Sequence, residues 1–201
     1  MFENKQLSWD ALATLHRKIL RCRKCRLSRT RRHAVPGEGP SNAKIMFVGE
    51  APGENEDQEG RPFCGRSGLF LDKLFDSAGI RRQEVYITSS VKCRPPGNRD
   101  PKSDELETCG EAWLERQIEI IKPHLIVLLG RVALSQMLGE TRALGEFQGK
   151  ILERNGLKIL PTYHPAAGMR FPVPAQKMKS DFRIIRRVVS ANTSDLSAGK
   201  L

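Results

Sequence analysis

Five acidic side chains crowd the glycine-rich segment 49–65, directly after an apolar run at residues 44–48 that is typical of a buried strand. They are Glu50, Glu54, Glu56, Asp57 and Glu59. In α/β proteins the carboxyl end of a strand is where ligands bind and chemistry takes place. A solvated loop is the plainer alternative. Because the chain carries a net charge of +11, we interpret the segment as a reactive loop on a protein whose surface binds a polyanion.

Two ring side chains have settings that suit the same site. Phe63 lies between Pro62 and Gly65, so its ring is presented in a turn, where it could stack on a nucleic-acid base. Packing of Phe63 in the core is the alternative. His164 follows an apolar run and precedes a proline, which keeps it extended and outside a helix. At a strand end it could donate a hydrogen bond to developing negative charge. The other three histidines are interpreted as surface or core residues.

Four of the five cysteines have the spacing of metal ligands. Cys22 and Cys25 are separated by two residues, and Cys93 and Cys109 by fifteen. We favour one four-thiolate site, which could hold zinc or an iron–sulfur cluster, and which would fasten the N-terminal segment to the rest of the chain. Buried thiols at 93 and 109 with a redox pair at 22 and 25 are the alternative. Cys64 is interpreted as a small packed thiol.

Basic residues are concentrated in two stretches, 16–33 and 170–187, and the first contains nine Lys or Arg and no acid. This clustering favours a nucleic-acid partner over a merely solvated surface. No apolar run is long enough to span a membrane, and the N-terminus lacks the plan of a signal peptide. We therefore expect no membrane partner and a cytoplasmic protein.

Strand and helix patterns alternate along the chain and predict an α/β fold, a three-layer sandwich with a central, mostly parallel sheet between helices. Strands are expected at 45–48, 85–91 and 125–129, with an Asn155-Gly156 hairpin within 151–160. Helices are expected at 9–20, capped by Ser8, at 68–78, capped by Ser67, and at 104–122, 131–138 and 176–189, with loops between them. The chemically notable positions fall at strand ends and should line one site. Residues 1–190 are expected to form one domain, with segment 8–35 docked on it, and 191–201 a disordered tail.

Several segments, in this order, resemble the family 4 uracil-DNA glycosylases, the iron–sulfur members of the uracil-DNA glycosylase superfamily. They are 49–57 (GEAPGENED), 60–63 (GRPF), 86–88 (YIT), 91–96 (VKCRPP), 98–99 (NR), 129–130 (LG) and 164–166 (HPA). The resemblance runs from about residue 20 to residue 187. It implies a hydrolase that flips uracil out of DNA and cleaves its N-glycosidic bond, leaving an abasic site. It also implies a four-stranded sheet and a monomer acting on uracil-containing DNA in base excision repair, associated with the nucleoid through DNA binding.

The resemblance assigns roles to particular residues. It implies a [4Fe-4S] cluster on Cys22, Cys25, Cys93 and Cys109, with zinc as the alternative metal. It implies that uracil is held by Gly49, Glu50, Ala51, Phe63, Ser89 and His164. It implies that Glu50, Glu56 and His164 act in catalysis, and that Met169 is the apolar wedge inserted into DNA.

Ser89 is the main departure from the family pattern, which commonly has Asn there. A hydroxyl is shorter than an amide and cannot make its bidentate contact with the uracil edge. A glycosylase with a broader or different base preference is therefore an alternative, as is a non-catalytic, metal-stapled nucleic-acid binding module. A relative that links covalently to DNA is disfavoured, because residues 93–101 lack the basic, histidine-containing insertion of that branch.

Overall fold

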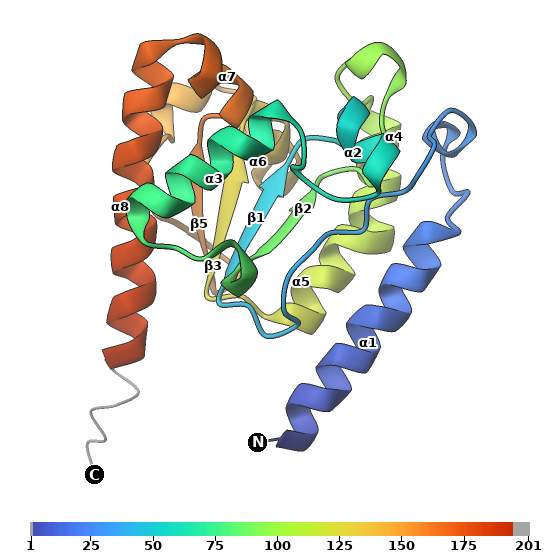
Figure 1. Ribbon diagram of the computed structural model, residues 1–201, viewed down its shortest axis with the longest axis horizontal. Helices are drawn as coiled ribbons and strands as arrows, with labels where there is room; N and C mark the ends of the chain where they lie inside the picture. Colours follow the sequence, from blue (N-terminus) through green and yellow to red (C-terminus); the bar gives the residue numbers. More distant parts are fainter. Residues whose placement is uncertain (1, 195–201) are drawn as a thin grey trace.

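The computed structural model describes the backbone of residues 2–194 and the side chains of residues 7–188. Its centre is a sheet of five strands in the order β2-β1-β3-β5-β4 (Figure 1). The strands are β1 (Ile45–Gly49), β2 (Tyr86–Ser89), β3 (Leu125–Leu129), β4 (Leu152–Arg154) and β5 (Leu157–Thr162). The first three and β5 are parallel, and β4 pairs with β5 in the antiparallel direction. The expected count of four strands is thus one too low, because the Asn155-Gly156 hairpin adds a short edge strand.

Helices connect the strands and cover the sheet. The α-helices are α1 (Phe2–Leu20), α2 (Glu54–Glu59), α3 (Arg66–Ala78), α4 (Ser103–Cys109), α5 (Glu115–Ile121), α6 (Arg131–Leu138), α7 (Pro165–Arg170) and α8 (Pro172–Ser194). A π-helical segment, Gly110–Leu114, joins α4 to α5 within the long helix that the sequence predicted.

Several helices differ from the sequence-based expectation. Helix α3 has Gly65 and not Ser67 as its N-cap, α7 was not expected, and α8 begins at Pro172. Helix α1 begins at Phe2, and Ser8 bonds the Ser41 hydroxyl at 3.0 Å instead of capping a helix. The acidic segment expected as a loop contains the helix α2, at whose start the Glu56 carboxylate accepts a hydrogen bond from the backbone amide of the N-cap residue Gly53. Helix α8 continues to Ser194, so the first residues of the predicted tail are helical, while 195–201 lie outside the described residues.

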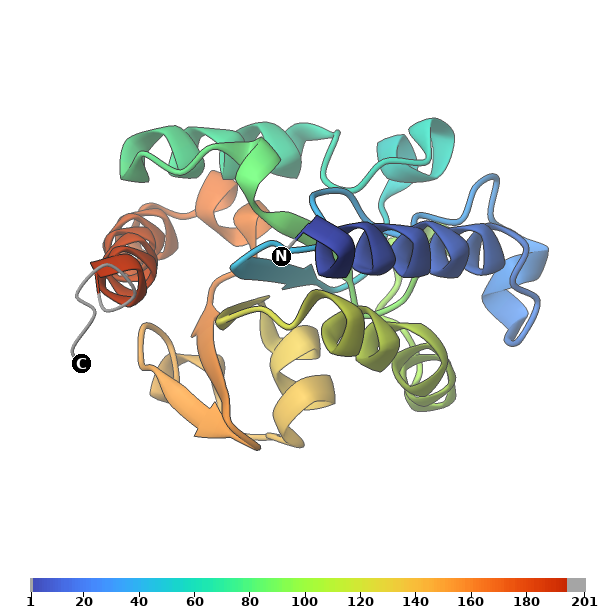
Figure 2. The same cartoon turned by 90° about the horizontal axis from the view of Figure 1, so that it is seen from below.

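Alternate residues of the central strands face two separate hydrophobic layers. Phe47 of β1 and Val127 of β3 pack with residues of α3 and α8, among them Phe75 and Phe182. Their strand neighbours point the other way, toward α1, α5 and α6. Figure 2 shows α3 on one side of the sheet and α5 and α6 on the other. This arrangement confirms the three-layer α/β fold and leaves the carboxyl ends of the parallel strands open for a site.

A third hydrophobic cluster fastens the N-terminal segment to the sheet domain. Leu15 and Ile19 of α1 and Leu27 of the following 3-10 turn pack with Val91 and Trp113. The four predicted metal ligands, Cys22, Cys25, Cys93 and Cys109, belong to the same cluster. Among the described residues, no helix combines the length and the apolar character that crossing a membrane requires.

Candidate functional site

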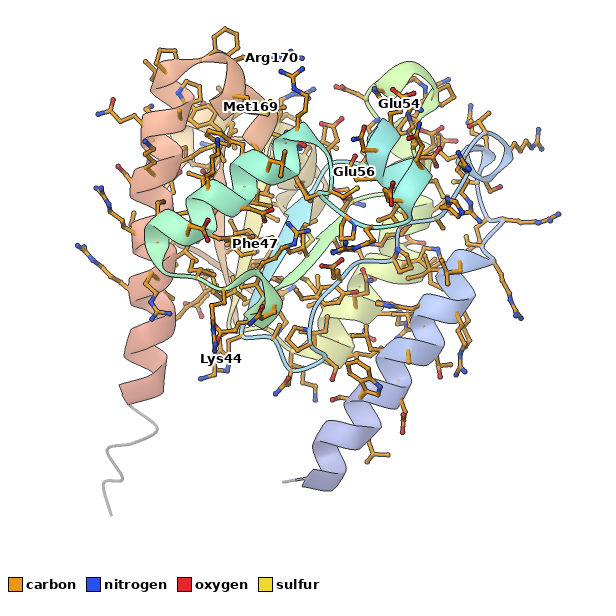
Figure 3. All side chains as sticks on the ribbon, viewed as in Figure 1. Lys44, Phe47, Glu54, Glu56, Met169 and Arg170 are labelled. Carbon is orange, nitrogen blue, oxygen red and sulfur yellow. The ribbon has the colours of Figure 1, made fainter. Side chains whose placement is uncertain are left out.

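A cavity of about 430 Å³ opens at the carboxyl ends of β1, β2 and β5. Six of the predicted site residues line it: Glu50, Ala51, Glu56, Phe63, Ser89 and His164. The cavity also takes in residues from α2, from the loop after β2 and from α7. Figure 3 shows Glu54 and Glu56 on α2 on one side of this edge of the molecule, and Met169 and Arg170 on α7 on the other. The strand ends therefore bring together side chains that are more than 100 positions apart in the sequence.

Phe63 is held in place by a strained backbone and by two glycines. Its φ of 49° lies in the left-handed region, which a bulky side chain rarely adopts. A Cβ atom on Gly49 would come within 2.6 Å of the Phe63 ring, and one on Gly68 within 1.8 Å of its carbonyl oxygen. The ring is 7% exposed and lies 5.9 Å from the imidazole of His164, centroid to centroid. Gly49 itself does not line the cavity; it makes room for the ring that does.

Glu56 fixes the shape of the acidic segment. One carboxylate oxygen accepts a hydrogen bond from the Gly53 amide at 3.0 Å, and the other accepts one from the Gly65 amide at 2.9 Å. The next residue, Asp57, accepts bonds from the backbone amides of Arg32 and His33. Glu56 and Asp57 are therefore buried and hold loops in place. The loop that Asp57 holds is the basic segment that precedes β1.

Glu50 stands apart from this anchoring role. No hydrogen bond to its carboxylate is found among the described residues, and the side chain faces the cavity. Burial, followed by the nearby carboxylate of Asp100, raises the pKa of Glu50, while the guanidinium of Arg131 opposes the shift. Arg131 in turn forms an ion pair with Asp100 at 3.0 Å. A half-desolvated carboxylate facing a cavity favours any positive charge that forms in front of it.

His164 is the N-cap of α7, and its Nδ1 atom accepts a bond from the Ala166 amide at 3.2 Å. This assigns the ring proton to Nε2, which leaves Nε2 as a donor. Burial lowers the pKa of His164 to about 4, although the carboxylate of Glu56 opposes the shift. The imidazole is therefore neutral at pH 7 and can donate one hydrogen bond from Nε2 without carrying charge. Gly130 leaves room for this side chain, since a Cβ there would lie 3.1 Å from the His164 Cβ.

Ser89 ends β2 directly opposite Gly49 of β1 in the parallel register. It is 4% exposed and lines the cavity. The adjacent backbone is bonded to β1, because the Ser90 amide donates to the Gly49 carbonyl and the Val91 amide to the Glu50 carbonyl. The position of the Ser89 hydroxyl is thus set by the main chain rather than by a long side chain.

Cys93 and Cys109 are members of the third hydrophobic cluster and Cys22 and Cys25 pack against it, and all four are free thiols. Sulfur atoms here accept hydrogen bonds: Cys93 from the Arg31 guanidinium at 2.8 Å, and Cys109 from the Lys92 amide at 3.3 Å. Burial raises the pKa of Cys93, and that of Cys109 to about 12, so these thiols are protonated at pH 7 and a bound metal would have to displace their protons. Within the described part of the chain, no three Cys, His, Asp or Glu side chains are close enough together to hold a single metal ion.

Comparisons with known proteins agree with this geometry. The family model described as "Uracil DNA glycosylase superfamily" matches residues 36–185. A Type-4 uracil-DNA glycosylase of Saccharolobus solfataricus is 46% identical over 191 residues, which cover 90% of this chain and 88% of that protein. The enzyme of the same name from Archaeoglobus fulgidus is 44% identical, covering 88% and 92%, and that of Thermotoga maritima 42%, covering 80% and 84%.

This chain belongs to the type-4 uracil-DNA glycosylase family. The match confirms the resemblance read from the short motifs, and it includes the strands, the acidic segment and the histidine loop of the cavity. Cys22 and Cys25 precede the residues matched by the superfamily model, whereas Cys93 and Cys109 lie within them.

The family motifs did not single out every residue that lines the cavity. Arg99 and Arg170 both contribute to its wall, although neither was predicted as a site residue. Arg99 also makes a bidentate ion pair with the buried carboxylate of Glu105. Met169, the predicted wedge, is 37% exposed and does not line the cavity, so it lies outside the wall to which its neighbour Arg170 belongs. Arg99 stands in the 98–99 motif that carried the resemblance, whereas the signal for Arg170 was weak, because it is one of many arginines in this basic glycosylase.

Proposed function

We propose that this protein is a DNA repair enzyme that flips uracil out of DNA and hydrolyses its N-glycosidic bond, leaving an abasic site. The observation that carries the proposal is the cavity in which the Phe63 ring, the neutral His164 imidazole and the Glu50 carboxylate converge. Its volume of about 430 Å³ suits a single base with part of its sugar. The relatives named type-4 uracil-DNA glycosylases support the same reaction.

The flipped base stacks on Phe63 in this proposal. Flipping a base costs a few kcal/mol of lost stacking and pairing, and stacking on an aromatic ring returns roughly 1–3 kcal/mol. The strained backbone of Phe63 supports the role, because a left-handed bulky residue in a well-packed turn is typical of a functional position. Gly49 leaves room for the ring, Ala51 lines the cavity beside it, and the Ser89 hydroxyl offers one polar contact to the base edge.

His164 stabilises the departing base. As the glycosidic bond lengthens, negative charge collects on the uracil oxygens, and the Nε2 proton of His164 donates to one of them. A neutral imidazole suits this task, because a uracil anion leaves readily and needs a hydrogen bond more than a strong acid. The Ala166 amide keeps the ring in the tautomer that presents Nε2 as donor.

Glu50 acts on the sugar side. The sugar becomes oxocarbenium-like as the base departs, and a carboxylate facing it stabilises that cation or orients the attacking water. Glu50 is free to do so, whereas both oxygens of Glu56 are occupied by backbone amides. We therefore assign the direct role to Glu50, and to Glu56 the support of the loop that carries the site.

The basic surface and Met169 act on the DNA. Phosphates bind to the basic stretches 16–33 and 170–187, and Arg170 brings positive charge to the cavity wall itself. Met169, on the same short helix, enters the space that the flipped nucleotide leaves. The three exposed apolar side chains Met169, Phe171 and Val173 give this end of the molecule a surface that can contact unstacked bases.

The four cysteines hold an iron–sulfur cluster in this proposal. Cys22, Cys25, Cys93 and Cys109 share one apolar cluster, and backbone or guanidinium N–H groups donate to three of the sulfur atoms, those of Cys22, Cys93 and Cys109. Four thiolates are the usual ligand set of such a cluster, and Cys22, Cys25, Cys93 and Cys109 would supply it. When bound, the cluster would fasten segment 8–35 to the sheet as part of one domain, residues 1–190.

A paired test separates this function from DNA binding alone. Purified protein is incubated with a single-uracil oligonucleotide, and abasic sites are detected as strand breaks after alkali. His164→Ala and Glu50→Gln should lower the rate strongly, while His124→Ala and Glu59→Gln, which alter exposed residues of the same types, should not. If neither site variant slowed strand breakage, the assigned mechanism would be wrong. An intact strand with the wild-type protein would overturn the proposed function.

A further inference from the structure

Lys92 is one of the most deeply buried side chains in the molecule, with 1% exposure. Its ammonium group donates to the Thr88 hydroxyl at 2.7 Å and to the Ser89 carbonyl oxygen at 2.6 Å. Burying a charged lysine is costly unless it is bonded, and such lysines are rare outside functional or structural centres. Both of its acceptors lie at the end of β2, and one of them belongs to a residue that lines the cavity.

The ammonium group ends a buried chain of hydrogen bonds that crosses the molecule. The Thr88 hydroxyl donates to the Pro36 carbonyl at 2.8 Å, which also accepts from the Gln117 amide at 2.7 Å. Gln117 also donates to the Tyr86 hydroxyl, which is bonded to His16 of α1 at 2.7 Å. A network whose members are bonded in this way has few alternative arrangements, so it holds the end of β2 rigid.

Lys92 also connects this rigid strand end to the cysteine cluster. Its backbone amide donates to the sulfur of Cys109, its backbone carbonyl accepts from the Val35 amide, and the next residue is Cys93. The lysine side chain folds back from this point toward Ser89. One residue thus spans the distance from the proposed metal ligands to the base-facing strand end.

We propose that Lys92 is a positioning residue for base selection: its ammonium group fixes the Ser89 carbonyl and so holds the Ser89 hydroxyl at the base edge. The proposal rests on the proposed function. The hydroxyl of a serine is bonded directly to Cβ, so its position is set by the main chain. If the main chain shifts, the hydroxyl cannot keep its contact with the base. Three bonds therefore fix the main chain at this point: those from the Ser90 and Val91 amides to β1, and the one from Lys92.

The test compares Lys92→Met with Ser89→Ala and with the double variant. Lys92→Met keeps the length of the side chain and removes the donor, and Lys73→Met, at an exposed position on α3, is the matched control. We expect Lys92→Met to lower kcat/KM for uracil about tenfold, the effect of one lost hydrogen bond of roughly 1.4 kcal/mol. The loss should be absent when Ser89 is already alanine, because the lysine acts through that residue.

A binding measurement gives a readout that does not depend on turnover. Oligonucleotides that carry 2′-fluoro-2′-deoxyuridine, which resists cleavage, are compared with the same strands carrying thymidine. Lys92→Met should reduce the preference for the uracil analogue about tenfold and leave affinity for the thymidine strand unchanged. Equal losses on both strands would indicate a general structural defect and overturn the proposal, as would additive effects of Lys92→Met and Ser89→Ala.

Iron content and visible absorption are recorded for every variant. If Lys92→Met loses iron or does not fold, Thr88→Val carries the test, because it removes the hydroxyl that holds the ammonium group beside the Ser89 carbonyl and leaves Lys92, the neighbour of Cys93, unchanged. The same non-additivity with Ser89→Ala is then expected, and additivity overturns the proposal. If the wild-type protein releases no uracil, the proposed function fails; if it does and the Lys92→Met variant matches it, only the role of Lys92 fails.

Discussion

Replacing His164 by alanine removes the one neutral ring donor that faces the cavity. The donor contributes only when negative charge has developed on the base, so the loss should fall on kcat rather than on KM. Loss of a comparable preorganised donor costs roughly 10²–10³-fold in kcat, or about 2.7–4 kcal/mol. We expect His164→Ala to lie in this range, and His124→Ala, at an exposed position at the opposite end of β3, to match the wild-type protein.

The pH dependence tests the protonation state on which this role rests. With a pKa of about 4, His164 is protonated in about one molecule in a hundred at pH 6, because each pH unit above the pKa is a factor of ten. An ordinary histidine, with a pKa near 6.5, would be mostly protonated at that pH. The pH–rate profile of the wild-type protein should therefore show no acid limb near pH 6.5. Any loss of activity at lower pH should reflect protonation of Glu50, whose pKa is raised.

Single-turnover kinetics across pH 5 to 8.5, on one uracil-containing oligonucleotide, measure both effects together. Single turnover separates the chemical step from product release. The reasoning is refuted if the wild-type profile has an acid limb near pH 6.5 that disappears in His164→Ala, since the imidazole would then titrate in the working range. It is also refuted if His164→Ala retains the wild-type rate at neutral pH.

Four further predictions follow from the same structure. Glu50→Gln should lower kcat by roughly 10²-fold or more and remove the acid limb, measured in the same single-turnover assay. Cys93→Ala should lose iron and have a lower melting temperature, whereas Cys64→Ala should retain the iron and the melting temperature of the wild-type protein. Iron analysis and thermal unfolding measure these two quantities. Met169→Ala should slow uracil release from double-stranded DNA more than from single-stranded DNA, because only the duplex requires a wedge. His16→Gln should make the folded state less sensitive to acid. Burial lowers the pKa of His16 in the folded protein to about 4, so the unfolded chain binds the proton first as the pH falls from 6.5 to 4. The wild-type protein therefore loses at most about 3 kcal/mol of folding free energy through that window, a loss that the variant should not show. Equilibrium urea unfolding at pH 7 and pH 5 measures that difference.

Much of the site could be predicted because its residues follow strands. The apolar run before Gly49 and the one before His164 are unmistakable, and parallel strands place their carboxyl ends on one edge. Glu50, Ser89 and His164 were expected to meet for that reason, and the cavity contains all three. The four cysteines were grouped by spacing, and the structure places them in one hydrophobic cluster.

The parts that the sequence did not predict depend on contacts between distant segments. The helix α2 forms where a loop was expected, because Glu56 bonds the amide of Gly53 at its start and that of Gly65 beyond its end. The left-handed backbone of Phe63 requires space that Gly49 and Gly68 provide, and no local pattern indicates it. The burial of Lys92 is the opposite of what its residue type predicts, and only its acceptors on β2 explain it.

The most direct test of the central claim is to identify the base that the wild-type protein releases. Four oligonucleotides that differ only in carrying uracil, cytosine, thymine or hypoxanthine at one position are incubated together with the protein. Mass spectrometry then quantifies the free bases, and alkali reveals the abasic sites. We predict that free uracil appears in a one-to-one ratio with strand breaks in the uracil strand, and that no other base is released at a comparable rate. DNA binding without any free base would contradict the account.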